Sequence, residues 1–440
     1  NTGALANLGA LTVSGGTLSG GSTVTVSGAF TWAGGTISGT GSNTLTTNGA
    51  ATLSGGTKTL TSRIWNNAGT ATWTGGNIDL SGASAVLNNQ ATGTFNVQNG
   101  AGGDDIFGAG TFNNAGNLVV NSATFDSSIA NAVFNNTGAV TVTQGRLHVL
   151  SNGTDTGSYT VTAGNFLTFG GGFVGPTVTH NLDAGASITG AGTVEVASIL
   201  SPGTLNVNAG ASISAGVNLS AGTLNVNTGA LANLGALTVS GGTLNVNTGS
   251  TVSVTGSTTI SGGTANLNAG SNVTGTGSVN VTGGVLNVNV PLTFANTFTL
   301  TGGESVTLGG SGNVTLNGAF NWSGGADIAG TGLLTTNGTT TITGSGGNGI
   351  GKNWNNTGTV NASRIVYFAP ATVTNQAGGV FNLTTADATP IDVCCGASGT
   401  FANAGTFNKT VAGTQAISGS VTFNNTGTVA AQSGTLSLNG

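Results

Sequence analysis

Side chains able to perform acid–base chemistry are few in this 440-residue chain, which has 11 Asp and Glu, six Lys and Arg, and two His. Enzymes that cleave polysaccharides need clustered carboxylates or cations in a groove. Only Asp104 and Asp105 are adjacent acids, and the sequence 289 residues later has no acid at the matching place. His148 and His180 stand alone, and no Ser lies in motif spacing with a His and an Asp. We therefore expect no catalytic residue and no enzymatic activity.

A metal or cofactor site is also weakly indicated. The stretch GGDDIFGAG at 102–110 is similar to a glycine–aspartate calcium-binding turn. Such turns come in arrays, and this one occurs once. We expect an exposed acidic turn here, with no metal and no cofactor.

Two cations occupy equivalent places in the sequence. Arg63 and Lys352 each precede a tryptophan by two residues and are 289 residues apart. They could point outward toward a carbohydrate or a partner, or they could cover apolar surface with their aliphatic stems. We favour the structural role.

The five tryptophans could form a sugar-binding platform or fill a core. Trp65 and Trp354 begin copies of a repeated motif, which favours the core for these two. The sequence leaves both possibilities open for Trp32, Trp73 and Trp322.

Composition excludes several classes of protein. Charged residues make up 4 % of the chain, and six Lys and Arg cannot form the basic patch that a nucleic-acid backbone requires. No apolar run approaches the ~20 residues of a membrane-spanning helix, and no secretion signal is visible. The chain contains no Met, so we interpret it as a mature protein or an internal piece of a longer one.

The two cysteines, Cys394 and Cys395, are adjacent. A disulfide between them would be strained, and one of them could instead bridge to another chain. We favour two small buried thiols. They provide no disulfide framework that would prove an oxidising compartment.

Repetition is the strongest signal in the sequence. One motif consists of an apolar residue, Asn or a substitute, a second Asn, a small residue and Gly, and within each half of the chain it recurs every 19 to 28 residues. Its copies begin at Trp65, Leu87, Phe112 and Phe134, and again at Trp354, Val373, Phe401 and Phe423. A second family, LNVN, fills the middle of the chain from Leu205 to Leu286 at steps of 19 to 21, with its fourth copy reading ANLN at Ala265.

A longer period lies above the short one. Trp65 and Trp354 are 289 residues apart, as are Phe134 and Phe423. The chain therefore holds about one and a half copies of a unit near 290 residues, with 1–289 as the first copy and 290–440 as a partial second copy. Residues 1–18 are also identical to 227–244, which indicates recent duplication.

Within each short period, apolar and polar residues alternate as in strands, and Gly pairs mark turns every six to ten residues. A coil of about 20 residues holds three short strands, and stacked coils bury a core that one coil cannot. We predict an all-β fold, a right-handed, three-sided parallel β-helix (β-solenoid) with about 20–22 residues per coil and roughly 20 coils. Residues 1–440 would form a single continuous solenoid.

The motif residues have a predicted place in this fold. The apolar residue should point inward and stack as a ladder, the asparagines should occupy the turns and hydrogen-bond to neighbouring coils, and Gly should close the corner. If the same charged side chain recurred in every coil, like charges would stack ~4.8 Å apart and repel one another. This repulsion accounts for the scarcity of charged residues. The predicted core and corner residues are Trp65, Asn66, Asn67, Leu87, Phe112, Asn113, Phe134, Asn135, Trp354, Asn355, Val373, Phe401, Phe423 and Asn424.

With stretches such as GGTLSGGSTVTVSG, GTFNNAGNLVV and LSAGTLNVNTGA, nearly the whole chain resembles the parallel β-helix parts of large bacterial surface proteins. These are filamentous-haemagglutinin-like exoproteins, autotransporter passengers and related giant adhesins. The resemblance implies secretion or a cell-surface location, a right-handed helix, and adhesion or scaffolding.

The expected function is a non-enzymatic extracellular rod, stalk or fibre shaft whose copies associate end to end or continue in a longer chain. The alternative is a cell-surface adhesin with a carbohydrate or cell-surface ligand, for which 361–398 is the candidate loop leaving the repeat. Ice binding would need a flat, regular Thr array, and the Thr-x-Thr pairs here are too irregular.

Overall fold

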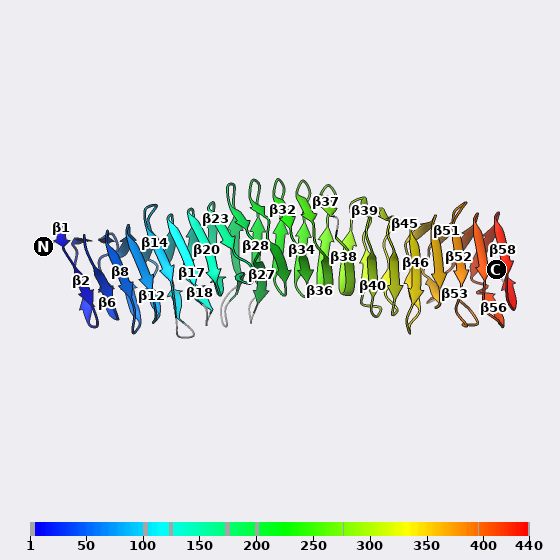
Figure 1. Ribbon diagram of the computed structural model, residues 1–440, viewed down its shortest axis with the longest axis horizontal. Helices are drawn as coiled ribbons and strands as arrows, with labels where there is room; N and C mark the ends of the chain where they lie inside the picture. The colour runs from blue at the N-terminus through cyan, green and yellow to red at the C-terminus, as the bar shows by residue number, and fades with distance from the viewer. Residues whose placement is uncertain are drawn as a thin grey trace. The chain divides into compact units, whose positions relative to one another are not determined.

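The fold consists of short parallel β-strands wound into successive coils (Figure 1). The structure is a computed structural model and describes residues 5–99, 104–122, 126–171, 177–198, 202–275, 277–394 and 396–438. No helix occurs among these residues, and the strand pairings between coils are parallel. The predicted class, a parallel β-solenoid of about 20 turns, is confirmed. Its right-handed sense stays a prediction.

The chain divides into two compact units, Asn1–Gly235 and Ala236–Gly440. The predicted continuity of 1–440 and the repeat boundary at 289 stay predictions.

The first unit has three walls, each built from one strand per coil. Wall A begins with a seven-stranded sheet. Its strands are β1 (Leu5–Leu8), β4 (Thr23–Val26), β7 (Thr44–Thr47), β10 (Ile64–Asn67), β13 (Val86–Asn89), β16 (Thr111–Asn114) and β19 (Val133–Asn136). The wall goes on with β22 (Gly153–Asp155), β25 (Val178–Leu182), β28 (Gly203–Val207) and β31 (Thr223–Val226).

The other two walls of the first unit follow the same order. Wall B comprises β2 (Leu11–Val13), β5 (Phe30–Trp32), β8 (Ala50–Leu53), β11 (Thr70–Trp73), β14 (Thr94–Val97), β17 (Asn117–Asn121), β20 (Ala139–Gln144), β23 (Ser158–Val161), β26 (Ser187–Thr189), β29 (Ser212–Ile213) and β32 (Leu231–Leu234). Wall C comprises β3 (Thr17–Leu18), β6 (Gly35–Ser38), β9 (Lys58–Thr61), β12 (Ile78–Ser81), β15 (Asp105–Gly108), β18 (Ser127–Ala130), β21 (Arg146–Leu150), β24 (Phe166–Gly171), β27 (Thr193–Ser198) and β30 (Gly216–Leu219).

The second unit repeats the plan, except that two long strands each pass through a corner and belong to two walls. The early strands are β33 (Leu237–Val239), β34 (Thr243–Val246), β35 (Thr251–Val254), β36 (Thr258–Leu267), β37 (Asn272–Gly275), β38 (Val279–Val288), β39 (Leu292–Phe294), β40 (Phe298–Thr301), β41 (Thr307–Gly309) and β42 (Val314–Leu316). The remaining strands are β43 (Phe320–Ser323), β44 (Asp327–Ile328), β45 (Leu333–Thr336), β46 (Thr339–Thr343), β47 (Asn348–Ile350), β48 (Asn353–Asn356), β49 (Thr359–Ala362), β50 (Val366–Phe368), β51 (Thr372–Asn375), β52 (Val380–Leu383), β53 (Ile391–Val393), β54 (Gly399–Asn403), β55 (Thr406–Lys409), β56 (Thr414–Ile417), β57 (Val421–Asn425), β58 (Thr428–Ala431) and β59 (Thr435–Leu438).

Coil length varies more than a single period suggests. The register places Asn206 opposite Asn225, 19 residues on, whereas Asn375 lies opposite Asn403, 28 residues on. Most strands keep a similar short length while the turns absorb the difference. The predicted 20–22 residues per coil therefore describes an average.

The strands are two-sided because successive side chains of a strand point to opposite faces. In β10 the order is half-buried Ile64, buried Trp65, half-buried Asn66 and buried Asn67. The inward residues are mostly apolar and fully covered by the coils above and below. Burying apolar area at roughly 25 cal/mol per Å² drives the stacking.

The segment 361–398 does not leave the solenoid. It contributes part of β49 and the whole of β50, β51, β52 and β53, each paired with strands of the neighbouring coils. The longest stretch between these strands is 384–390. The expectation of a long protruding loop here is wrong, because the extra residues are shared among turns.

Candidate functional site

The apolar residues that begin the motif form a column inside each unit. Trp65, Leu87, Phe112 and Phe134 lie opposite one another on successive strands of wall A and are fully buried. Only Phe112 and Phe134 are neighbouring aromatic rings of this column, with centroids 5.3 Å apart. Phe95 of wall B fills the space between Trp65 and Phe112. The ladder is thus shared between two walls.

The same column recurs in the second unit on β48, β51, β54 and β57. Trp354, Val373 and Phe401 are buried, and Phe423 on the last of these strands is half-buried. The rings of Phe401 and Phe423 are stacked at 5.6 Å. Trp65 and Trp354 each donate an indole hydrogen bond to a buried Thr of the preceding coil, at 3.1 and 2.8 Å.

The second asparagine of each motif forms an amide ladder along the core, which we call the inner ladder. In the first unit Asn67 donates to Asn89 at 2.8 Å, Asn89 to Asn114 at 2.7 Å, and Asn114 to Asn136 at 2.8 Å. All four side chains are fully buried. The side-chain amide nitrogen of each also donates to a backbone carbonyl of the next coil, so the buried amide groups of these four asparagines have partners.

The second unit has its own inner ladder of the same kind. Asn356 donates to Asn375 at 2.9 Å, Asn375 to Asn403 at 2.8 Å, and Asn403 to Asn425 at 2.7 Å. Except for Asn67, the asparagines of the two inner ladders are absent from the residues that we predicted. The sequence did contain a signal, because the second Asn is present in all eight copies of the motif whereas the first is replaced at Thr374 and Ala402.

The first asparagine of each motif faces outward, and in the first unit it forms an outer ladder. Asn88 donates to Asn66 at 2.8 Å, Asn113 to Asn88 at 2.9 Å, and Asn135 to Asn113 at 2.9 Å. The donor here belongs to the later coil, whereas in the inner ladder it belongs to the earlier one.

In the second unit the outward asparagines of this motif do not meet. Asn355 and Asn424 lie in one column with Thr374 and Ala402 between them. No outer amide ladder therefore links these two predicted residues.

The asparagines lie at the ends of strands, which corrects the predicted turn position. Among the described residues the only non-glycine residues with positive φ are Ser62 and Asn131. The glycine of the motif is required by close backbone approach instead. A Cβ on Gly69 would lie 2.2 Å from the carbonyl oxygen of Gly49 in the preceding coil.

The rare cations are mostly buried in the corners. Arg63 is 1 % exposed and donates to the carbonyl oxygens of Ser38 at 3.0 Å and of Ser22. Lys352 is 0 % exposed and donates to two glycine carbonyls at 2.9 and 3.0 Å. Outward contact with a carbohydrate is therefore excluded for both. Burial lowers their pKa values.

Lys58 and Lys409 play the same part without having been singled out in the sequence. Lys58 donates to three backbone carbonyls at 2.7 to 3.2 Å, and Lys409 to two. Burial lowers the pKa of Lys58 to about 8, partly offset by the negative charge of Asp104. Each of these cations therefore donates to backbone carbonyl oxygens.

All five tryptophans are buried, which settles the three that the sequence left open. Trp32, Trp73 and Trp322 are at most 1 % exposed. A tryptophan sugar platform is therefore excluded.

Both histidines contact an aspartate, contrary to the expectation that they stand alone. His180 lies in the core, 2.6 Å from Asp155, which also accepts from the Tyr159 hydroxyl at 2.5 Å and from the backbone N–H of Asn136 at 2.7 Å. His180 packs between Phe134 and Phe169 rings. Burial and the Asp155 charge raise the pKa of Tyr159 well above its usual value.

The second histidine belongs to a solvent-facing cluster on wall C that we call the charged face: Asp105, Asp126, Arg146, His148 and Glu195. His148 lies 3.0 Å from Asp126, and Arg146 bridges Asp126 and Glu195. Asp105, His148 and Glu195 share one outward column of successive strands.

Further contacts hold the charged face in place. The Arg146 guanidinium lies 4.5 Å over the Phe166 ring, and Glu195 also accepts from Thr168 at 3.0 Å. Asp105 accepts from Ser128. Burial raises the pKa of Asp105, with a smaller contribution from the charge of Asp104.

Sequence spacing could have revealed both aspartate–histidine pairs. Asp126 and His148 are 22 residues apart, and Asp155 and His180 are 25 apart, which is about one coil in each case. The carboxylates of the charged face are already paired with cations or hydroxyl groups. The charged face can therefore present hydrogen-bond donors and acceptors to a polar ligand.

The remaining candidates are resolved in part. Among the described residues no three His, Cys, Asp or Glu side chains are grouped to hold a metal ion. Residues 102 and 103 of the calcium-like turn and Cys395 lie outside the described residues. Cys394 is half-buried, so the expectation of a buried thiol is wrong for this residue.

The fold and its ladders define a repeat protein of the parallel β-solenoid class. No protein-family model matches the sequence, and no curated protein matches it. The resemblance to filamentous-haemagglutinin-like and autotransporter proteins therefore stays an expectation beyond the shared fold. No helix in the described part of the chain has the length and apolarity needed to cross a membrane.

Proposed function

We propose that the chain is a non-enzymatic structural protein outside the cell, serving as a stalk or fibre shaft. The observation that carries the proposal is the use of its buried polar side chains. The inner ladders and the buried cations join coil to coil, and they leave few groups for chemistry. Each stacked unit is thereby reinforced along its own stacking direction.

Self-association would extend the same coil-to-coil contacts from one copy of the chain to the next. The edge strands of a stack present unpaired backbone N–H and C=O groups. In this proposal they pair with the edge strands of another copy, or with further coils of a longer chain. Coils of different sequence already pair in parallel throughout each unit, for example β13 with β16. End-to-end stacking of copies needs no new type of contact.

Electron microscopy of the purified chain at increasing concentration tests this proposal. Fibres that lengthen with concentration are expected, with a meridional spacing of ~4.8 Å in fibre diffraction. Short monodisperse particles at all concentrations would remove the end-to-end association. Hydrolysis of a polysaccharide by the chain would remove the non-enzymatic role.

A second candidate, an adhesin, is favoured by the charged face. It gathers on one wall five of the 19 Asp, Glu, Lys, Arg and His side chains of the chain. A carbohydrate or cell-surface ligand with several hydroxyl groups would find both donors and acceptors there.

Glycan-array binding of the intact chain distinguishes the two candidates. If the adhesin proposal is right, Arg146→Gln abolishes glycan binding while Arg364→Gln, which breaks an ion pair elsewhere, does not. If neither the wild type nor the variants bind any glycan, the structural proposal stands alone.

A further inference from the structure

In the second unit, the wall that contains β35, β37, β39 and β42 is interrupted between two consecutive coils. Strand β35 pairs with β37, and β39 pairs with β42, but among the described residues no pairing joins β37 to β39. The inward residues at the break are consequently only half-buried: Val273 on β37, and Leu292 and Phe294 on β39. Their counterparts on β35, Val252 and Val254, are buried.

The coil on the earlier side of this break also lacks two large inward side chains. Ala265 lies in register between Leu244 and Leu286, because the repeat that reads LNVN in those coils reads ANLN here. Gly275 lies opposite Val254. Both small residues, Ala265 on β36 and Gly275 on β37, therefore lie in the coil whose strand β37 has no pairing with β39 among the described residues.

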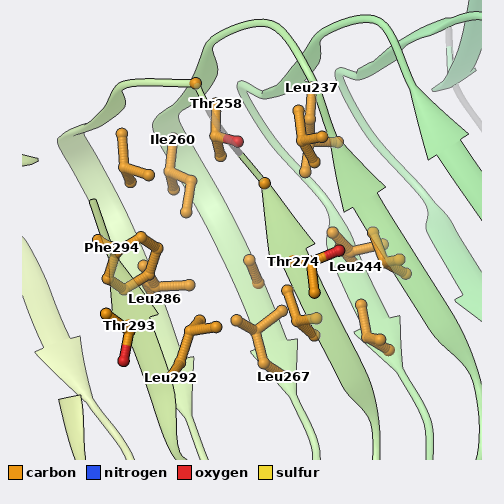
Figure 2. Close-up of a pocket in the computed structure, with 18 residues that line it drawn as sticks. Leu237, Leu244, Thr258, Ile260, Leu267, Thr274, Leu286, Leu292, Thr293 and Phe294 are labelled. Atoms are coloured by element: carbon orange, nitrogen blue, oxygen red, sulfur yellow. The ribbon is translucent and has the colours of Figure 1, made fainter. Parts of the chain in front are cut away.

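Together these features leave a cavity of about 60 Å³ inside the second unit. Figure 2 shows Leu244, Leu267, Leu286 and Leu292 around it, with Phe294 at one side. Since one water-sized sphere needs about 10–15 Å³, the cavity has room for about four to six atoms or groups of that size. A cavity with this apolar lining favours an apolar guest over water.

The chemistry at the mouth is neutral. The hydroxyl-bearing residues Thr274 and Thr293 are exposed on the two strands that flank the break. The sequence from 196 to 303 contains no Asp, Glu, Lys, Arg or His. A carboxylate or phosphate on a bound molecule would have no cationic partner nearby in the sequence, whereas a hydroxyl group would have neutral partners.

We propose that this cavity binds the end of an unbranched, uncharged apolar chain, such as a short alkyl group, which enters between β37 and β39. In this proposal a slender chain passes between the two strands, which no pairing joins in the described part of the chain, more readily than a bulky one. The polar end of the molecule stays outside, beside Thr274 and Thr293. This site is independent of the stalk and adhesin proposals, because it uses neither a ladder nor the charged face.

The test uses the full chain with ¹³C-labelled Leu and Val methyl groups and 1-pentanol as the probe. Titration should give saturable shifts of the Leu267, Leu286 and Leu292 methyl signals, and the alcohol should raise the melting temperature. The branched isomer 2-methyl-2-butanol should bind at least tenfold more weakly. Equal affinity of the two alcohols, or shifts that never saturate, would overturn the proposal.

A cavity-filling variant supplies the second arm. Ala265→Leu restores the side chain of the neighbouring repeats and should weaken 1-pentanol binding at least tenfold while raising the melting temperature. Ala362→Leu is the matched control, because Ala362 is equally buried in the same unit but does not line the cavity. It should lower the melting temperature and leave binding unchanged. Where Ala265→Leu misfolds, Ala265→Val takes its place.

Two further results would also overturn the proposal. Binding by Ala265→Leu with wild-type affinity would place the alcohol elsewhere and overturn the proposal. Sedimentation showing a dimer whose formation shields the Leu292 methyl signals from 1-pentanol would also overturn it, because a strand of a second copy would then occupy the break.

Discussion

Replacing one member of the inner ladder should cost far more stability than replacing its neighbour in the same strand. Asn114 is fully buried, accepts from Asn89 at 2.7 Å, and donates to Asn136 at 2.8 Å and to the carbonyl of Ala139 at 3.1 Å. Asn114→Ala removes three hydrogen bonds worth about 1 kcal/mol each and leaves buried groups unpaired, for a total of about 3–5 kcal/mol.

Asn113 is the matched control because it precedes Asn114 and forms two ladder bonds on the outer side. It donates to Asn88 at 2.9 Å and accepts from Asn135 at 2.9 Å. Asn113 is half-buried, so water can replace its partners after Asn113→Ala. The expected loss is about 0.5–1 kcal/mol.

Urea unfolding followed by circular dichroism measures the two losses. Hydrogen exchange then locates them, because stability in a stacked repeat is built from neighbour contacts. Asn114→Ala should accelerate exchange in β13, β16 and β19 first. Equal shifts of the unfolding midpoint for the two variants would refute the claim that buried amide bonds carry the stack, and so would acceleration spread evenly over both units.

Three further predictions concern charge and backbone approach. In the folded chain the pKa of Lys58 is lowered to about 8 from its usual value of 10.5, so between these pH values Lys58 holds its proton in the unfolded chain and loses it in the folded chain. The free energy of unfolding of the wild type should therefore rise relative to that of Lys58→Met from about pH 8 to pH 10.5. Urea midpoints of both proteins across this range should show that rise, and a constant difference would contradict it. Gly69→Ala places a Cβ 2.2 Å from a carbonyl oxygen and should cost about 1–3 kcal/mol in thermal unfolding, whereas Gly15→Ala, with open space around it, should stay within about 0.5 kcal/mol, and similar losses would contradict the steric argument. Asp155→Ala leaves three buried donors unpaired and should cost about 3–5 kcal/mol, while Asp126→Ala at the surface should cost about 0–1 kcal/mol; calorimetry of both variants checks the ratio, and a larger loss for the surface residue would reverse the interpretation.

Much of the fold could be predicted because its signal is local and repeated. The alternation around Trp65 has period two, and the motif recurs at the length of one coil. Both features follow from strand geometry, so they persist whatever surrounds them. The strand class, the parallel stacking and the inward position of Phe112 and Phe134 all rest on them.

The functional details were less accessible. The turn position assigned to Asn66 and Asn67 was wrong, because the tolerance of Asn for turns is only a tendency and here the buried amide bonds outweigh it. The partners of His148 and His180 lie one coil away, and the unequal lengths of the coils blur which side chains face each other. The break beside β37 leaves only a faint sequence trace at Ala265.

Within the first unit, one tetrapeptide separates what the sequence determines from what it does not. Leu-Ala-Asn-Leu forms β1 on wall A and, unchanged, β32 on wall B. The sequence determined that these four residues form a strand with alternating faces, because that depends on neighbours along the chain. Which wall the strand joins was decided only by the tertiary structure, because it depends on how many residues all the preceding turns have used.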